Sequence, residues 1–304
     1  MIISASRRTD IPAFYTPWFM ERIRRGFVEV PNPVRLRQVN RISLAPVDVD
    51  AIVFWTRDPR PLLPHLAELD LRGYAYYFLF TLLDYPRLLE PFTPAAGEAV
   101  DSFRRLADRI GPERVIWRYD PVIFSNLTPP EFHREVFPRL ASALRGATRR
   151  VIVSRLDVYR KVARQLQALV EENFRLLPLA TGDEAAQDTF RCLAATAAAH
   201  GMGIQSCAEG AALESCGIAA GRCIDDDLVR TLFNIDVSHR KDPSQRQHCR
   251  CVVSRDIGMY DTCLHGCRYC YAMAGRAVCL ANRRRHNPGG STLVPPSPAD
   301  EAPQ

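Results

Sequence analysis

The sequence has little lysine, and its first 191 residues contain no cysteine. The 304 residues include 38 arginines but only two lysines, so the formal net charge of +6 is as consistent with codon bias as with selection for a basic surface. Such a charge permits weak attraction to nucleic acid without indicating it. The longest apolar run, Tyr74 to Leu83, is far shorter than the roughly 18 residues of a membrane-spanning helix. Because Met1 to Ser6 is also too short for a signal-peptide core, we expect a cytoplasmic protein.

Short apolar runs alternate along the chain with amphipathic stretches, in a composition (47% hydrophobic, 24% charged) that is ordinary for a globular protein. Six of these runs are predicted strands: Ile2 to Ser6, Ala51 to Thr56, Ala75 to Leu82, Arg114 to Tyr119, Arg150 to Arg155 and Gly203 to Ala208. Most of them are continuously apolar rather than alternating, which is typical of parallel strands buried on both faces.

Amphipathic helices are predicted between the strands. They are expected over Val100 to Ile110, Phe132 to Leu140, and within 156–171 and 184–200. Gly111 and Pro112 end the first of these, because glycine accepts a positive φ and proline cannot continue a helix. Five of the six strands are followed directly by a helix, which predicts a parallel βα architecture, either a doubly wound sheet or an incomplete barrel.

We favour an α/β fold in which residues 1–240 form a partial TIM-type (β/α)6 barrel. Phe27 to Leu44, with prolines at 31 and 33, is predicted to be a hairpin inserted after the first helix. Residues 241–286 are expected to form a cysteine-rich iron-sulfur segment packed on the barrel. Residues 287–304 contain five prolines and no apolar periodicity, so we expect a disordered tail.

The cysteines are concentrated near the end of the chain: all ten follow residue 191, and six lie within 249–279. In a long chain without a secretion signal, clustered cysteines more often hold metal than form disulfides. Cys263, Cys267 and Cys270 are spaced C-x3-C-x2-C, with Tyr269 directly before the last. Thiolates suit iron-sulfur clusters or zinc. Because a structural zinc site requires a fourth ligand, three thiolates favour a four-iron cluster with one iron free of protein ligands.

This spacing resembles the signature of the radical S-adenosylmethionine enzymes, and the stretch from Cys263 to Ala272 is similar to that of spore photoproduct lyase and its photolyase-like relatives. Over roughly residues 1 to 275 the chain also resembles a bacterial family known as domain of unknown function 1848. The segments that carry this second resemblance are 3–12, 53–56, 115–121, 207–209 and 256–258. The first resemblance implies a 4Fe-4S cluster on the three cysteines and reductive cleavage of S-adenosylmethionine, which starts radical chemistry on an unknown substrate.

The sequence departs from the ordinary radical enzyme in two ways. The cysteine loop normally follows the first barrel strand, whereas here it follows the sixth predicted strand. We therefore expect Cys251 to Tyr260 to supply the strand or extension that carries the loop. No Gly-Gly-Glu follows the second strand, so the usual partner of the S-adenosylmethionine amino group is missing.

Polar residues gather at the predicted carboxyl ends of the strands, where barrel enzymes place their chemistry. If S-adenosylmethionine binds, its expected polar contacts are Thr56, Arg118, Asp120, Arg155, Asp157 and Glu209. At the end of the first strand, Arg7, Arg8 and Asp10 either clamp an anionic substrate or pair with one another. We favour contact with substrate or cofactor, because a strand end has little structural need of two adjacent arginines.

A second group of thiols is formed by Cys207, Cys223, Cys249 and Cys251, which suit a second iron-sulfur cluster or a zinc site. The alternative is that they are buried apolar cysteines, a common fate of this residue. That alternative is our interpretation of Cys192, Cys216 and Cys279. Within the loop, His265 either contacts the cluster or cofactor or, with Gly266, shapes the turn, and Tyr269 and Tyr271 pack near the cluster or form the apolar side of the loop.

The leading hypothesis is therefore an iron-sulfur enzyme of the radical S-adenosylmethionine type. The alternative is a structural zinc- or iron-sulfur-binding α/β-barrel protein, either a non-radical hydrolase or a nucleic-acid-binding protein. The first hypothesis requires an electron donor such as flavodoxin or ferredoxin, and we expect no membrane partner. Nucleic acid is a candidate substrate, on the photolyase-like motif and the sequence pI of 8.9.

Overall fold

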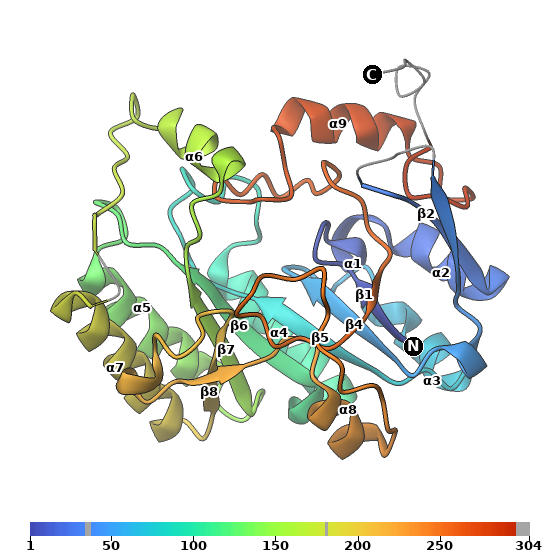
Figure 1. Cartoon of the computed structure of the whole chain (residues 1–304), viewed down its shortest axis with the longest axis horizontal. Coiled ribbons are helices and arrows are strands. Elements are labelled where there is room, and N and C mark those ends of the chain that lie inside the picture. Colours follow the sequence, from blue (N-terminus) through green and yellow to red (C-terminus); the bar gives the residue numbers. More distant parts are fainter. Residues whose placement is uncertain (34–37, 180–181, 296–304) are drawn as a thin grey trace.

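Eight parallel strands form one open sheet in the computed structural model, which describes residues 1–33, 38–179 and 182–295 (Figure 1). Across the sheet the order is β10 (Arg255–Asp256), β1 (Ile2–Ala5), β4 (Ala51–Thr56), β5 (Tyr76–Thr81), β6 (Val115–Val122), β7 (Arg150–Arg155), β8 (Gly203–Cys207) and β9 (Ala219–Gly221). All neighbouring pairs are parallel. The carboxyl ends of all eight strands therefore face one edge of the sheet.

The parallel α/β prediction is confirmed, and all six predicted strands form. The sheet is larger than predicted, because β9 and β10 contain only three and two residues and carry no apolar pattern of their own. It is also open: within the described residues, the edge strands β10 and β9 do not pair with each other, so no closed barrel is formed. From β1 through β4 to β8 the strands follow one another in chain order, without the reversal of a doubly wound sheet.

Nine α-helices are found in the described residues. They are α1 (Ile11–Phe14), α2 (Thr16–Arg25), α3 (Leu66–Leu71), α4 (Ala96–Ile110), α5 (Pro130–Ala143), α6 (Arg160–Gln167), α7 (Glu184–Ala199), α8 (Asp226–Phe233) and α9 (Arg276–Arg285). Helix α4 is followed by Gly111, whose φ of 92° glycine adopts without steric strain. Its buried face, which includes Phe103 and Leu106, packs on the sheet as the periodicity predicted.

The predicted hairpin is also present. Strands β2 (Phe27–Pro31) and β3 (Val39–Ser43) pair antiparallel, with Phe27 opposite Ser43. The expectation that 251–260 supplies a strand is met by β10, which pairs with β1. As a result, the segment that carries the cysteine loop lies beside the first strand of the sheet, although it is nearly the last in the sequence.

The two faces of the sheet are covered by different parts of the chain. Alternate strand residues such as Phe54 and Phe78 belong to the larger core, which also holds the buried residues of α2, α4 and α5. Their neighbours Val53 and Tyr77 face a second core, which includes buried residues of the segment 223–252 and of α8. Because side chains alternate along a strand, a continuous apolar run is needed to fill both cores.

The described part of the expected tail is packed rather than free. Trp18 Nε1 donates to the carbonyl oxygen of Gly290 at 3.0 Å, and Leu293 and Val294 are 1% and 2% exposed. Two adjacent apolar residues give no periodic pattern, so the sequence did not reveal this contact. Residues 296–304 lie outside the described part of the chain. No helix in that described part is long and apolar enough to cross a membrane.

Candidate functional site

The loop with Cys263, Cys267 and Cys270 lies over the carboxyl ends of β1 and β4 and beside the segment that follows β5. The chain enters this region from β10, where Ile257 N donates to the Ser4 carbonyl at 3.0 Å. Further on, Arg268 N donates to the Leu89 carbonyl at 2.9 Å, and Tyr271 Oη donates to the Arg7 carbonyl at 2.9 Å. The loop is therefore at the edge of the sheet where chemistry is expected in parallel α/β proteins.

Asp10 fixes this loop to the strand ends. Its carboxylate accepts hydrogen bonds from Ala13 N (2.9 Å), Thr56 Oγ1 (2.8 Å) and Arg57 N (2.7 Å), and it contacts His265 Nε2 at 2.8 Å. The side chain is only 5% exposed. All four partners are protein groups, so in this structure Asp10 organises the loop, a role that the sequence did not predict. Thr56 likewise donates to Asp10 rather than facing open space.

His265 lies within the loop and uses one of its two ring nitrogens to hold it. Its ring is 3% exposed and packs against Phe14, with centroids 4.6 Å apart. Nε2 binds Asp10, whereas Nδ1 is buried without a hydrogen-bond partner in the described part of the chain. Since the Asp10 carboxylate is an acceptor, we assign a proton on Nε2 to this bond.

Tyr269 anchors the other side of the loop to a buried ion pair. Arg57 Nη2 lies 2.8 Å from Glu90 Oε1 and donates to Tyr269 Oη at 2.6 Å, and Tyr269 Oη also donates to Glu90. Burial alone would lower the pKa of Arg57, but Glu90, Tyr269 and Cys267 together outweigh it and raise this pKa well above its ordinary value. A permanent cation is therefore held close to Cys267, whose own pKa it acts to lower.

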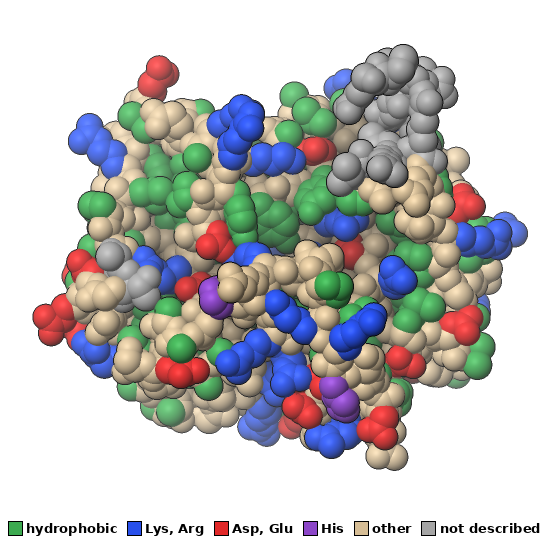
Figure 2. Space-filling view, viewed as in Figure 1, with side chains coloured by type: hydrophobic (Ala, Val, Ile, Leu, Met, Phe, Trp, Pro, Cys, Tyr) green, Lys and Arg blue, Asp and Glu red, His purple; other side chains and the backbone are tan. Residues whose placement is uncertain are grey.

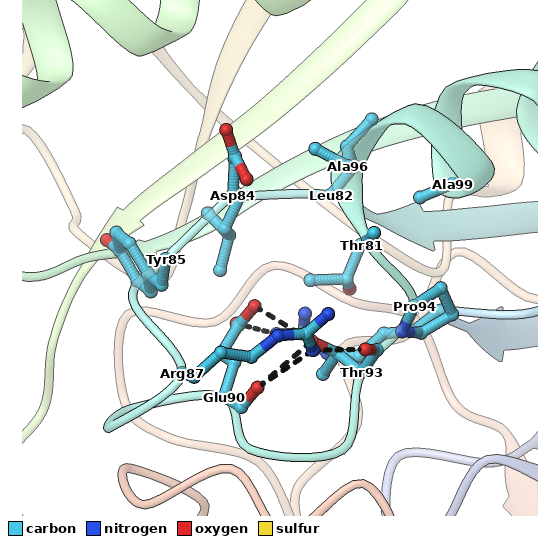
Figure 3. Close-up of a pocket in the computed structure, with 13 residues that line it drawn as sticks. Thr81, Leu82, Asp84, Tyr85, Arg87, Glu90, Thr93, Pro94, Ala96 and Ala99 are labelled. Carbon is cyan, nitrogen blue, oxygen red and sulfur yellow. Dashed lines mark hydrogen bonds and ion pairs between the residues drawn. The ribbon is translucent and has the colours of Figure 1, made fainter.

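A small cavity borders the same ion pair. Its volume is about 110 Å³, and Arg57, Asp84, Arg87 and Glu90 are among its lining residues (Figure 3). Arg87 Nη1 donates to the Thr93 carbonyl at 2.6 Å across it. Ligand pockets usually enclose at least about 300 Å³, so this cavity is too small for a cofactor and belongs to the support of the loop.

The three loop thiols lie near one another in a largely buried position. Burial raises the pKa of Cys263, Cys267 and Cys270 to about 12, and each thiol feels the charge of another member of the set. Cys267 is 8% exposed, and the other two are partly exposed. In the metal-free chain these thiols are protonated at neutral pH, so binding of a metal would release protons.

The other predicted cofactor contacts lie on three neighbouring strand ends and are paired with protein groups. Arg118 forms an ion pair with Asp120, which also accepts from Ser154 Oγ. The Arg155 backbone N–H donates to Glu209 Oε1 at 2.9 Å, and burial raises the pKa of Glu209. Asp157, further from the sheet, pairs with Arg246. The structure thus gathers Arg118, Asp120, Arg155 and Glu209 along one edge of the sheet, whereas Asp157 forms an exposed ion pair with Arg246.

Arg7 and Arg8 do not pair with Asp10 in the described structure. Arg7 Nη1 donates to Ser254 Oγ at 3.2 Å, and its guanidinium lies 5.5 Å from the centre of the Trp55 ring. Arg118 lies over the same ring at 4.7 Å. Arg8 instead lies 5.1 Å from the Tyr260 ring and donates to the Gly258 carbonyl at 3.3 Å. Two arginines therefore lie against the Trp55 ring, and a third lies against the Tyr260 ring.

The space-filling view shows this face of the molecule (Figure 2). A hollow at the centre of this face contains hydrophobic side chains, a colour class that includes cysteine, tyrosine and tryptophan. Lys and Arg side chains lie around the hollow. Figure 1, drawn from the same side, places the hollow between α6 and α9 on one side and the C-terminal loops on the other. Gln165 of α6 donates to the carbonyls of Cys270 and Met273, so α6 borders the cysteine loop.

The fold and site define a parallel α/β protein with a cysteine-rich loop at the carboxyl edge of an open sheet. A family model described as Domain of unknown function (DUF1848) matches residues 2–272, and the chain belongs to this family. No curated protein and no solved structure matches it. The match extends from β1 to the end of the cysteine motif, so the loop and the sheet that carries it are parts of one family domain.

Proposed function

We propose that this protein is an iron-sulfur enzyme of the radical S-adenosylmethionine type, with Cys263, Cys267 and Cys270 as the ligands of a 4Fe-4S cluster. One observation carries the proposal: the three-thiol loop lies over the carboxyl ends of the parallel strands, at the edge where such sheets bind their substrates. A loop on the opposite edge would have favoured a purely structural metal.

The thiol arrangement supports a cluster better than a single zinc ion. Four sulfurs at about 2.3 Å from one zinc lie within roughly 4 Å of one another. In the described residues, the only three potential ligand atoms of His, Cys, Asp or Glu that all lie within 4.8 Å of one another are those of Asp225, Asp226 and Asp227. The loop sulfurs are therefore more widely spread than one tetrahedral ion requires, and a cluster with each thiolate on a different iron accommodates that spread.

The surrounding residues would support such a cluster in separate ways. Asp10 and His265 hold the loop at the ends of β1 and β4, and Arg57 places a buried cation beside Cys267. Tyr271 is 44% exposed and follows Cys270, so it is placed to shield the open side of the site. The cofactor itself would supply the electron and the reactive group, and the chain would orient them and exclude water.

The polar strand ends are the proposed contacts of S-adenosylmethionine. Arg118 and Arg155 could engage its carboxylate, while Asp120 and Glu209 could accept hydrogen bonds from its amino and hydroxyl groups. These four side chains would take the place of the missing Gly-Gly-Glu. Electron delivery would come from a flavodoxin or ferredoxin.

Anaerobic reconstitution tests the proposal. The protein should turn brown and bind iron and sulfide, and with dithionite and S-adenosylmethionine it should release 5′-deoxyadenosine. Cys267→Ala should abolish that release, whereas Cys216→Ala should retain it, because Cys216 is also buried but lies between β8 and β9, outside the loop. Two results would refute the proposal. One is a protein that binds stoichiometric zinc and no sulfide. The other is a protein that binds iron and sulfide but leaves S-adenosylmethionine intact under these conditions.

A further inference from the structure

Four cysteines outside the loop come together on the face of the sheet opposite the main helical core. Cys207 is the last residue of β8, Cys223 follows β9, and Cys249 and Cys251 precede β10. They are 8%, 1%, 5% and 2% exposed in that order. They come from three separate segments of the chain, and all four pack in the same core with Tyr77 and Ile116 of the sheet.

The sulfurs of these cysteines are in contact with one another. Cys223 Sγ lies 3.5 Å from Cys207 Sγ, and Cys251 interacts with both Cys223 and Cys249. This links all four in the order Cys207, Cys223, Cys251, Cys249. In addition, the backbone N–H of Ile224 donates to Cys251 Sγ at 3.3 Å. Backbone N–H groups directed at sulfur are typical of metal-bound thiolates, whose charge they stabilise.

Cations face this group of sulfurs from neighbouring elements. Arg7, at the end of β1, interacts with Cys251, and Arg246 Nη2 lies 4.0 Å from Cys207 Sγ. Arg118 of β6 also acts on Cys207. Four thiolates in a dry core would carry a large negative charge, which a metal and these arginines could compensate. Cys216 shows the contrast, because it is also buried, at 4% exposed, and no other cysteine sulfur is found in contact with it in the described structure.

We infer that Cys207, Cys223, Cys249 and Cys251 form a second metal site, with four thiolate ligands, that holds an iron-sulfur cluster. A cluster fits the spacing better than zinc does. The Cys207–Cys223 pair is close, at 3.5 Å, yet no three of the four sulfurs all lie within 4.8 Å of one another. A single tetrahedral zinc would gather all four, whereas a cluster divides its thiolates among several irons.

The inference does not depend on the proposed function, because the two sites share no cysteine. They are nevertheless neighbours: Arg7 interacts with Cys251 through its side chain and accepts the Tyr271 hydroxyl through its carbonyl, and Tyr271 directly follows Cys270. A redox-active cluster in the second site would therefore lie close to the first. Iron in one site can be measured without the other by removing the ligands of one set.

The test starts from the wild-type chain and a triple variant, C263A/C267A/C270A, both reconstituted anaerobically with iron and sulfide. The wild-type chain should hold more than about four irons, and the triple variant should retain at least about two irons with equivalent sulfide. Adding Cys223→Ser and Cys251→Ser to the triple variant should remove that remainder, whereas adding Cys216→Ser and Cys279→Ser should not. Circular dichroism checks that each variant is folded.

Two results would overturn the inference. One is a wild-type chain that saturates at about four irons, all of which are lost in the folded triple variant, because those irons then belong to the loop. The other is a folded triple variant with one zinc and no sulfide, which would refute the iron-sulfur cluster. Retention of iron and sulfide that is lost only with Cys223 and Cys251 would support it.

Discussion

Replacement of Asp10 by alanine should destabilise the fold strongly. The carboxylate is 5% exposed and accepts from Ala13 N, Thr56 Oγ1 and Arg57 N, besides its contact with His265. An unsatisfied buried donor costs about 1–3 kcal/mol, and loss of a helix cap about 1 kcal/mol. Because neighbouring losses are not fully additive, we expect a decrease of about 4 kcal/mol in the free energy of unfolding. With an m-value of about 3 kcal/mol/M, the urea midpoint should fall by more than about 1 M.

The assay is equilibrium unfolding in urea, followed by circular dichroism under anaerobic conditions. Asp10→Asn provides a graded comparison, because the amide keeps one acceptor oxygen but places a donor against one of the N–H groups, and it should lose about half as much. Asp108→Ala is the matched control, since this aspartate is exposed on α4 and its loss should change stability by less than about 0.5 kcal/mol. Equal midpoints for Asp10→Ala and the control would refute the role of Asp10 as the anchor of the loop.

Three further predictions concern the loop and the core. Gly266→Ala should lower the iron content of the reconstituted protein, because φ is +70° and the new Cβ would lie 2.9 Å from Phe92 Cδ2; Gly275→Ala, with nothing within 4 Å, is the control. Glu90→Gln should destabilise the protein by about 3 kcal/mol in urea unfolding, since Arg57 stays charged and loses its buried partner. Burial lowers the pKa of His133 to about 4, so stability should fall as the pH drops from 6.5 towards 4, by about 1 kcal/mol between pH 7.5 and 5.5. His133→Gln should remove this pH dependence, and an unchanged slope would contradict it.

The central strands could be predicted from the sequence, because burial on both faces demands continuous apolar runs. Residues 51–56 and 150–155 form β4 and β7 with the predicted limits. The edge strands have no local pattern, and a strand within 251–260 was expected only from the resemblance to radical enzymes. β10 has only two residues and exists because Ser4 and Asp256 are brought into register, with Ser4 Oγ donating to Asp256 Oδ2 at 2.8 Å. Such pairing depends on tertiary contacts and leaves no local pattern.

The three loop thiols of the candidate site could be predicted from the sequence, whereas the residues that hold the loop in place could not. Spacing alone singled out the cysteines, because metal ligands recur at short fixed intervals. Arg57 and Glu90 were missed, since an arginine and a glutamate 33 positions apart give no sign that they form a buried pair. Asp10 was singled out as a candidate contact of substrate or cofactor and not as a support of the loop. Its Ser-Arg-Arg-Thr-Asp context suggested an anion clamp, whereas the carboxylate binds four groups of the protein itself.

The cysteine loop comes late in the sequence but lies beside the first strand, because β10 pairs with β1 at the edge of the sheet. The segment between β9 and β10 must then cross the open face of the sheet to reach that edge, and on the way it places Cys223, Cys249 and Cys251 against β8 and its neighbours. This one segment therefore contributes three of the four cysteines of the second group and leads through β10 into the cysteine loop. A change that displaced the chain directly after β10, such as Gly258→Ala, whose new Cβ would lie 2.1 Å from Ser6 Oγ, should disturb the loop and leave β4 to β8 intact.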